Sequence, residues 1–464
     1  MQINSQLTPK DLLPAVQNVF ALASGKIPRL DRRWNPADGS PVFTINGKYT
    51  ARGWTEWTQG FQYGSAILTY DATSDTKLLD LGKTRTIERM SPHITHTGVH
   101  DHGFNNISTY GALRRLMREG RIPHNDWELR FYEMALLASG SVQAMRWSPT
   151  IDNLGYVYSF NGPQSLFIDT IRSMRSLALA HQLGHTLLGE NDQRISLLER
   201  LIKHGLTTAK YNLYYGNNRD IYDTPATRGR TAHEAIFNTN DGRFRCPSSQ
   251  QGYSPFSTWT RGLAWAALGF AEQLEFLSTL GDDSFKFSST PEKQQVISTF
   301  ETAARAACDF YIEHSALDGI CYWDTGAPGM AHLGDYRARP ADPWNEHEPV
   351  DSSAGAIAAQ GLLRLGKYSG GTDGARYTQA GLAIANSLFT EPYLSKHPDH
   401  EGILLHSVYH RPNGWDNIPA KRKVPCDESS MWGDYHALEL ALLIKKLATG
   451  EYLRFFDSDK KVSI

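Results

Sequence analysis

Apolar residues recur every three or four positions along most of this chain, whereas strict alternation of apolar and polar residues is scarce. The first pattern is typical of helices with one buried face, and the second of half-buried strands. The helical spacing, together with cap and stop residues, predicts twelve helices. With ends uncertain by ~2–4 residues, their expected ranges are 9–25, 56–72, 75–90, 103–119, 125–146, 166–183, 191–213, 257–280, 291–313, 351–366, 373–388 and 429–448.

Long linkers rich in Gly, Pro, Asn and Asp separate some of these helices, at 26–54, 214–256, 314–350 and 389–428. Short strands are expected inside them, for example around Ile403–Tyr409. No low-complexity tract and no abrupt change of composition marks a domain boundary. We therefore expect one catalytic domain over residues 1–464, with the segment 1–50 packing on it.

Twelve helices paired as hairpins can close into a double-layered toroid, the (α/α)6 barrel of the all-α class. Six inner helices then run parallel, and six outer helices return. Each hairpin buries its apolar face against its neighbours, as in other repeat architectures, so one such domain can exceed the usual domain size. We take the even-numbered helices of the series as the inner ring.

Composition narrows the range of functions. The net charge of −2 gives no electrostatic case for binding nucleic acid or an anionic membrane. No apolar run approaches the ~18 residues of a membrane span, and the first residues lack the basic start of a signal peptide. The four cysteines, Cys246, Cys308, Cys321 and Cys426, are far apart and form no CxxC pair. We expect free thiols and a cytoplasmic protein.

Conspicuous polar and aromatic residues fall at the start of every even-numbered helix. In a toroid these six ends meet at one mouth, and six helix N-termini favour an anionic ligand there. N-capping is the commoner use of Asp and Ser at such places, and we assign Asp351, Ser352, Ser353 and Asp427 to it. Capping does not explain Trp57, Arg261, Trp265 or the triplet His100, Asp101 and His102. The other conspicuous residues at these helix starts include Trp54, Asp169, Trp259 and Trp432.

The stretch from Gln250 to Phe270 shows both possible interpretations of such residues. Ser257 or Thr258 fits an N-cap, and Arg261 and Trp265, four residues apart, share one helix face. Indoles stack on sugar rings, and a guanidinium can hold a carboxylate through two hydrogen bonds. The alternative is a buried helix with aromatic core residues.

Seven short motifs, in order, make the chain resemble glycoside hydrolase family 88, the unsaturated glucuronyl hydrolases. They extend over most of the chain, from about Trp54 to Leu447. The motifs are WTQGF at 57–61, HDHGF at 100–104, Ile-Asp at 168–169, Thr-x-His at 231–233, QGY at 251–253, STWTRGLAW at 257–265 and WGDYH at 432–436.

The resemblance implies an (α/α)6 barrel that takes a 4,5-unsaturated uronic acid at the non-reducing end of a small oligosaccharide, with no cofactor and no metal. It implies Asp169 as general acid and base, and Asp101 as the second catalytic aspartate. Trp147 matches the tryptophan before the sixth helix across an apparent insertion, in which Tyr156 or Tyr158 could take its stacking role. The implied substrate-binding residues are Trp57, Trp147, His233, Gln251, Trp259, Arg261 and Trp265.

The implied chemistry requires one carboxyl group that is protonated at rest and later acts as a base. An ordinary Asp pKa of about 3.9 is too low for this. We expect a neighbouring carboxylate, Asp101, to raise the pKa of Asp169 by like-charge repulsion. His233 and Gln251 can hydrogen-bond the sugar or water, and Arg261 can bind the sugar carboxylate or a neighbouring polar group.

Four alternatives remain open at this stage. The dense histidines His93, His96, His100 and His102 could form a metal site. Asp101 and Asp169 could be the base and acid of an inverting glycosidase. The chain also resembles the relatives that cleave unsaturated rhamnogalacturonan, and a non-catalytic sugar-binding scaffold is possible. The source polymer, sulfation preference, linkage and oligomeric state are not determined by the sequence.

Overall fold

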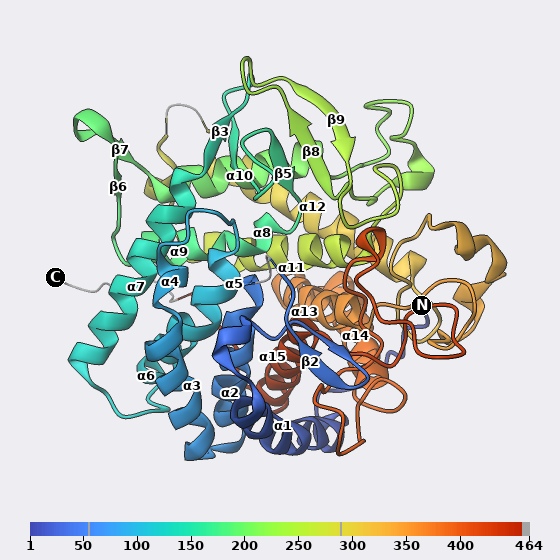
Figure 1. Ribbon diagram of the computed structural model, residues 1–464. Coiled ribbons are helices and arrows are strands. Elements are labelled where there is room, and N and C mark those ends of the chain that lie inside the picture. The colour runs from blue at the N-terminus through green and yellow to red at the C-terminus, as the bar shows by residue number, and fades with distance from the viewer. Residues whose placement is uncertain (54–55, 288–289, 457–464) are drawn as a thin grey trace.

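The computed structural model describes residues 1–53, 56–287 and 290–456, so the predicted mouth residue Trp54 lies outside the described residues (Figure 1). Helices dominate the fold. Their bounds are α1 Leu13–Arg33, α2 Gln59–Thr73, α3 Thr76–Arg89, α4 Ser91–Ile94, α5 His102–Asn106, α6 Ala112–Arg118, α7 Asp126–Met145, α8 Thr170–Ser173, α9 Arg175–Gln182, α10 Leu197–Tyr211, α11 Thr260–Leu277, α12 Lys293–His314, α13 Ser352–Ser369, α14 Gly371–Leu388 and α15 Met431–Ala448.

The inner helices form a closed ring. Each member contacts the next, in the order α2, α5, α8, α11, α13 and α15, and α15 contacts α2 again. The outer helices pack against this ring: α3 on α2, α7 and α10 on α9, α12 on α11, α14 on α13, and α1 on both α15 and α2. Figure 1 shows the ring surrounding the centre of the molecule. The predicted all-α toroid, with the even-numbered helices inside, is confirmed.

Most predicted helix ranges lie within a few residues of the observed bounds, but three differ by more. The first helix continues to Arg33, with Pro28 inside it, instead of ending near residue 25. The sixth begins at Thr170 instead of 166, because Ser165–Phe167 form a strand. The seventh begins at Leu197 instead of 191. The π-helical turn Ile107–Gly111 connects α5 to α6 within the predicted fourth helix.

Short antiparallel strands lie in the connections between the helices. The pairs are β1 Phe43–Ile45 with β2 Lys48–Thr50, β3 Trp147–Pro149 with β4 Gly155–Val157, β6 Leu187–Leu188 with β7 Arg194–Ile195, and the sheet of β5 Ser165–Phe167, β8 Glu234–Phe237 and β9 Phe244–Ser248. The strand expected around Ile403–Tyr409 is reduced to an isolated bridge between Leu394 and Leu404.

The inner helices approach one another closely, and glycine permits this. A Cβ on Gly361 of α13 would lie 2.7 Å from the backbone of Ala267 in α11. Buried ion pairs also tie the ring together. Arg172 of α8 contacts Glu272 of α11 at 2.7 Å and Glu439 of α15 at 2.9 Å, and all three side chains are fully buried.

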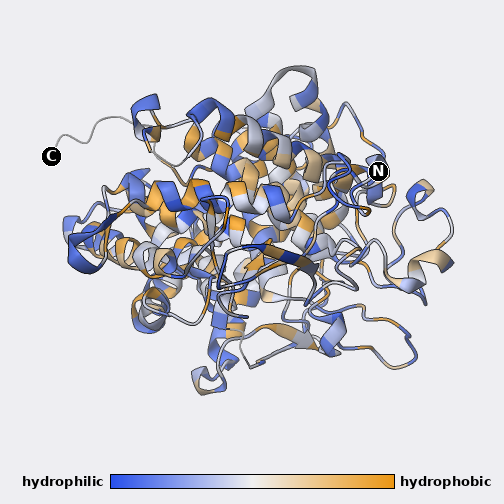
Figure 2. Ribbon diagram, turned by 90° about the horizontal axis from the view of Figure 1, so that it is seen from above, coloured by the Kyte–Doolittle hydropathy of each residue, from blue (hydrophilic) through white to orange (hydrophobic). Residues whose placement is uncertain are grey.

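Hydrophobic and hydrophilic positions alternate along the same helices (Figure 2), as two packed layers of amphipathic helices require. Within the described part of the chain, no helix has the length and apolar character needed to cross a membrane. The expected single domain over 1–464 stays a prediction.

Candidate functional site

Two aspartates and one histidine meet at the mouth of the ring. His100 Nε2 lies 3.2 Å from Asp169 Oδ1, to which it donates a hydrogen bond, and 3.7 Å from Asp101 Oδ1. The carboxylates of Asp101 and Asp169 therefore share one imidazole nitrogen. Both aspartates occupy N-cap positions, of α5 and α8, yet neither side chain makes a capping hydrogen bond. Capping therefore does not account for Asp101, and both carboxylates remain available for chemistry.

A small sheet brings together residues that are far apart in the chain. β8 pairs with β5 on one side, with Phe167 opposite Glu234, and with β9 on the other. Asp169 follows the end of β5, His233 precedes the start of β8, and Gln251 follows the end of β9. Because the three strands are antiparallel, all three residues lie at the same end of the sheet.

The electrostatics of the two aspartates differ. Burial raises the pKa of Asp101, and the charge of Asp169 adds to this shift, while His100 and Arg146 oppose it. Burial also favours a higher pKa for Asp169. The hydrogen bond from His100 and the positive charges of His100 and Arg261 outweigh this effect of burial, so the pKa of Asp169 is lowered. The expectation that Asp101 raises the pKa of Asp169 is therefore wrong for the free protein, because His100 stands between them.

His233 is fixed as a neutral donor. Its Nδ1 accepts hydrogen bonds from the backbone N–H groups of Gln250 at 2.9 Å and Gln251 at 3.4 Å. The ring proton must then sit on Nε2, which is buried and has no hydrogen-bond partner among the described residues. Burial lowers the pKa of His233 to about 4, so it stays uncharged near neutral pH.

Arg261 is buried between two indoles. Its guanidinium carbon lies 4.5 Å from the ring of Trp259 and 4.8 Å from that of Trp432. Its Nη2 donates to the Tyr409 carbonyl at 2.6 Å and to Gln251 Oε1 at 3.3 Å. Its Nε faces Asp351 Oδ2 at 3.5 Å. These contacts orient Gln251 and the loop that carries Tyr409.

The other predicted aromatic residues form a continuous cluster across the ring. Trp57 stacks on Trp432 at 5.2 Å and contacts Phe104, which in turn packs on Trp265 at 4.9 Å. Trp57 is partly exposed, whereas Trp259 and Trp265 are buried. Trp57 can therefore meet a ligand, while Trp265 supports the cluster from below.

Trp147 does not belong to this aromatic cluster. It begins β3, and its ring is covered by Arg200 of α10, 5.0 Å away. Within residues 1–53, 56–287 and 290–456, no hydrogen bond or ring contact joins it to the two aspartates. The apparent insertion instead supplies Phe160, which is 39% exposed and stacks on His100 at 5.9 Å. Of the two tyrosines considered, Tyr156 is buried, and Tyr158 lies over Arg146.

Sequence reasoning missed Phe160 because nothing in its local pattern distinguishes it from a loop residue. It placed His100 at the mouth and in a histidine cluster, but it missed the contact of this side chain with both carboxylates. The HDHGF motif was the available signal, since it places His100 directly before Asp101.

The capping assignments are partly confirmed. Asp351 caps α13 by accepting the N–H groups of Ser353 and Ala354. Ser353 and Ser352 lie inside that helix, where their hydroxyls bind Asp351 and the Leu405 carbonyl. The expectation for Asp427 is wrong: the cap of α15 is Ser430.

The expected cap at the start of α11 is also wrong, because its N-cap position belongs to Trp259. The predicted capping residue Ser257 donates its hydroxyl to Asp324 at 3.0 Å instead. Thr258 Oγ1 accepts the N–H of Thr231, the first residue of the Thr-x-His motif.

The four clustered histidines do not converge. The ring nitrogens of His93 contact Gln59 and Asn105, and those of His102 contact Ser139 and the His96 carbonyl, while His100 faces the aspartates. Among the described residues, no group of three or more His, Cys, Asp or Glu side chains is arranged to hold a metal ion.

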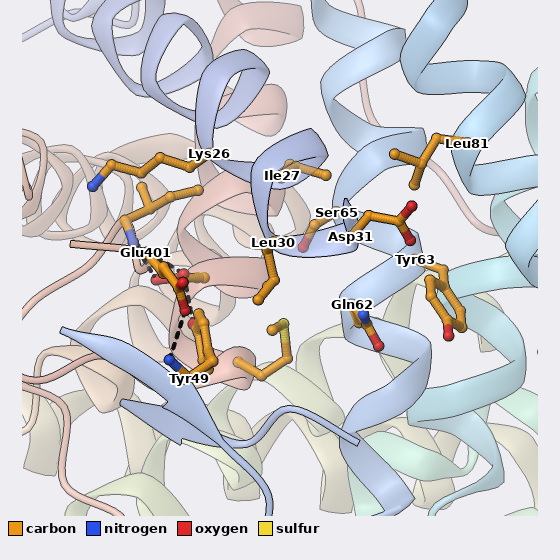
Figure 3. Close-up of a pocket in the computed structure, with 13 residues that line it drawn as sticks. Lys26, Ile27, Leu30, Asp31, Tyr49, Gln62, Tyr63, Ser65, Leu81 and Glu401 are labelled. Atoms are coloured by element: carbon orange, nitrogen blue, oxygen red, sulfur yellow. Dashed lines mark hydrogen bonds between the residues drawn. The ribbon is translucent and has the colours of Figure 1, made fainter. Parts of the chain in front are cut away.

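A small pocket lies away from this site (Figure 3). It holds about 20 Å³, room for one or two waters, between α1, β2, α2 and α15. Lys26, Tyr49, Gln62 and Glu401 are among its lining residues, and none of the predicted site residues lines it. We therefore locate the site from its side chains and not from this cavity.

Known proteins that are similar to this chain have related activities in their names. An unsaturated glucuronyl hydrolase of Formosa agariphila is 25% identical over 83% of this chain and 78% of its own length. Another from Bacillus sp. GL1 is 25% identical over 90% and 93%. An unsaturated chondroitin disaccharide hydrolase of Streptococcus agalactiae is 23% identical over 87% and 85%. No family model matches the chain.

Solved structures share the fold. The crystal structure of the Bacillus sp. GL1 unsaturated glucuronyl hydrolase matches with a TM-score of 0.69 and 20% identity, over 94% of this chain and 97% of that one. An unsaturated glucuronyl hydrolase specific for heparin matches with a TM-score of 0.69 and 19% identity, over 95% and 99%. The resemblance inferred from the motifs is confirmed by these relatives.

Proposed function

We propose that this chain, a homologue of the unsaturated glucuronyl hydrolases, is itself a glycoside hydrolase that removes a 4,5-unsaturated glucuronic acid from the non-reducing end of an oligosaccharide. The observation that carries the proposal is the pair of uncapped carboxylates sharing one nitrogen of His100 at the mouth of the ring. The names of the relatives, which act as glucuronyl or chondroitin disaccharide hydrolases, agree with this activity.

The substrate is a small oligosaccharide left by a polysaccharide lyase. Complexes of two structural neighbours hold such molecules, dGlcA-Glc-Rha-Glc in one and dGlcA-GalNAc6S in the other. The six helix N-termini around the mouth favour the uronate carboxylate of such a ligand. The exposed ring of Phe160 and the partly exposed ring of Trp57 offer faces for sugar stacking.

The reaction is hydration of a vinyl ether. A general acid gives a proton to C4, the π electrons form the new C–H bond, and positive charge develops at C5 and the ring oxygen. Water then adds at C5 and loses a proton to the same carboxylate. The hemiketal opens to a ketone, and the C1 hemiacetal releases the second sugar.

Asp169 is the general acid and base in this scheme, and general acid–base catalysis contributes roughly 10²–10⁴-fold. Asp101 binds sugar hydroxyls. Because it interacts with Asp169, the two carboxyl groups titrate as a pair. His233 serves as a donor to the reacting sugar or water through Nε2–H, which has no partner among the described residues, since Nδ1 accepts backbone N–H groups. Arg261 acts through Gln251, whose amide oxygen it binds.

The decisive experiment is turnover of unsaturated glucuronyl disaccharides, followed by loss of the vinyl-ether absorbance. Asp169→Asn is expected to reduce kcat by at least about 10²-fold and to keep the helical circular dichroism of the parent. The exposed Asp283, which pairs with Lys286 on the surface, gives a matched control, Asp283→Asn, with parental turnover. Near-parental activity of Asp169→Asn would refute the assignment. A panel of lyase products from hyaluronan, chondroitin, heparin, gellan, xanthan and ulvan then identifies the source polymer.

We place the enzyme in the cytoplasm. All four cysteines are free, and three of them are buried. Free thiols are typical of proteins in reducing compartments. Cell fractionation with an antibody against the chain tests this location.

A further inference from the structure

His100 is held rigidly in its place between the aspartates. Its ring stacks on Phe160 at 5.9 Å and meets the edge of Phe167 at 5.5 Å. Its carbonyl oxygen accepts hydrogen bonds from Gln143 at 2.8 Å and Ser173 at 2.7 Å. The side chain is 2% exposed, so water does not screen its contacts. The imidazole therefore stays in reach of both carboxylates.

The second ring nitrogen of His100 makes no hydrogen bond. Nδ1 is buried without a partner among the described residues. All exchange of protons with the protein must then pass through Nε2, the atom that faces Asp101 and Asp169. One nitrogen between two carboxyl groups can take a proton from one and give it to the other.

We propose that His100 is the proton-transfer link between Asp101 and Asp169, and that it loads Asp169 with the proton the reaction consumes at C4. The inference rests on the proposed function. It assigns His100 a positioning and relay role that acts through Asp169, with no contact to the sugar.

The link explains how Asp169 can act as an acid although its pKa is lowered in the free protein. The proton that the three groups share resides on Asp101 or His100 at rest, since the pKa values of both are raised. Burial, with the charge of Asp169, raises the pKa of Asp101. Burial would lower the pKa of His100, but the two carboxylates outweigh it. When this proton is on the ring, His100 is an imidazolium. It gives the Nε2 proton to Asp169 Oδ1 and remains a neutral imidazole protonated on Nδ1, and Asp169 passes the proton to C4. When water adds at C5, its proton returns to Asp169 and then to Nε2. The protein regains its starting state, and no external reagent is required.

Other charged and titratable groups face the cluster and shape its titration. Arg146 opposes positive charge on His100, and Arg261 favours the ionised form of Asp169. His204 and His233 stay neutral because burial lowers the pKa of each, to about 3 and about 4 respectively. The charge of His96 also acts on Asp101 and opposes the rise of its pKa.

The test is His100→Gln, because glutamine keeps a donor for Asp169 but cannot take up or release a proton. We expect kcat to fall at least about tenfold, KM to stay within about threefold, and the pH dependence of kcat to lose or shift one limb. His124→Gln, at an exposed surface histidine, is the matched control and should behave as the parent. An unchanged pH profile would overturn the proposal, with or without a loss of rate, because it would leave only a structural role.

A second measurement needs no activity and no change at His100. The imidazole nitrogens of the ¹⁵N-labelled protein are followed by NMR against pH, in the parent and in Asp101→Asn and Asp169→Asn. We expect the same histidine to titrate at lower pH in both variants. If no histidine responds to Asp101→Asn, the link is refuted. Absence of turnover in the parent would refute the proposed function while leaving this titration to decide the link.

Discussion

Arg261 of α11 and Asp351 of α13 face each other at 3.5 Å, with their side chains 1% and 0% exposed. Asp351 also caps its own helix, so one carboxylate both begins α13 and holds the arginine that orients Gln251. A buried charge that loses its partner is costly, because the remaining ion is left in a medium of low dielectric constant. The pair therefore connects the stability of two inner helices to the geometry of the site.

Replacement of Asp351 by asparagine should destabilise the protein. The amide oxygen can still cap α13, so the loss comes from the unpaired guanidinium of Arg261. We expect the free energy of unfolding to fall by about 3 kcal/mol, measured by urea denaturation. The surface variant Asp283→Asn should change it by less than about 0.5 kcal/mol. Equal stabilities of the two variants would contradict this view of the pair.

Phe160 should matter for substrate affinity, and Trp147 should not. Phe160 is exposed beside His100, whereas Trp147 is covered by Arg200. Loss of one stacking face costs about 1 kcal/mol, so Phe160→Ala is expected to lower kcat/KM roughly five- to tenfold. Trp147→Ala should stay within about twofold in steady-state assays. The reverse ranking would restore Trp147 to the sugar-binding role that the family resemblance implies.

His406 should make the protein sensitive to acid. It is 1% exposed, its Nδ1 accepts the Asp427 N–H, and burial lowers its pKa to about 4. Its unfolded pKa is about 6.5. A lowered pKa in the folded state means that the stabilisation is present above pH 6.5 and is lost as the pH falls towards 4.

Between pH 7 and pH 5, His406 should therefore cost the parent about 2 kcal/mol of unfolding free energy. In His406→Gln this contribution is absent, and the stability difference between the two pH values should shrink by that amount. Urea titrations at both pH values measure it. An identical pH dependence of parent and variant would show that His406 does not titrate on unfolding.

Two glycines in helices should respond oppositely to alanine. A Cβ on Gly361 would meet the α11 backbone at 2.7 Å, and backbone cannot give way as a flexible side chain can. Gly361→Ala is expected to cost about 1–3 kcal/mol. Gly25 of α1 has nothing within 4 Å of its Cβ position, so Gly25→Ala should stabilise the fold by about 0.4–1 kcal/mol. Thermal unfolding followed by circular dichroism separates the two, and a shift of the same sign in both would refute the close approach of α11 and α13.

The sequence by itself determined the helical architecture of this protein. The three-to-four-residue spacing of apolar positions is a local property, so it located the twelve helical regions and, with the clusters at even-numbered helix starts, the inner ring. The motif order determined the relationship to unsaturated glucuronyl hydrolases. It also named Asp101, Asp169, His233 and Gln251, which the structure brings to one mouth.

Only the tertiary structure decided how these residues are arranged and charged. β5 was too short and too apolar to be told from the start of a helix, and its pairing with β8 is what brings Asp169 beside His233. Phe160 reaches the site through a loop whose course no local pattern encodes. The pKa of Asp169 depends on His100, 69 positions earlier in the chain, at 3.2 Å. Helix formation follows from near neighbours in sequence, whereas electrostatic interactions depend on distances in space, and those exist only once the ring has closed.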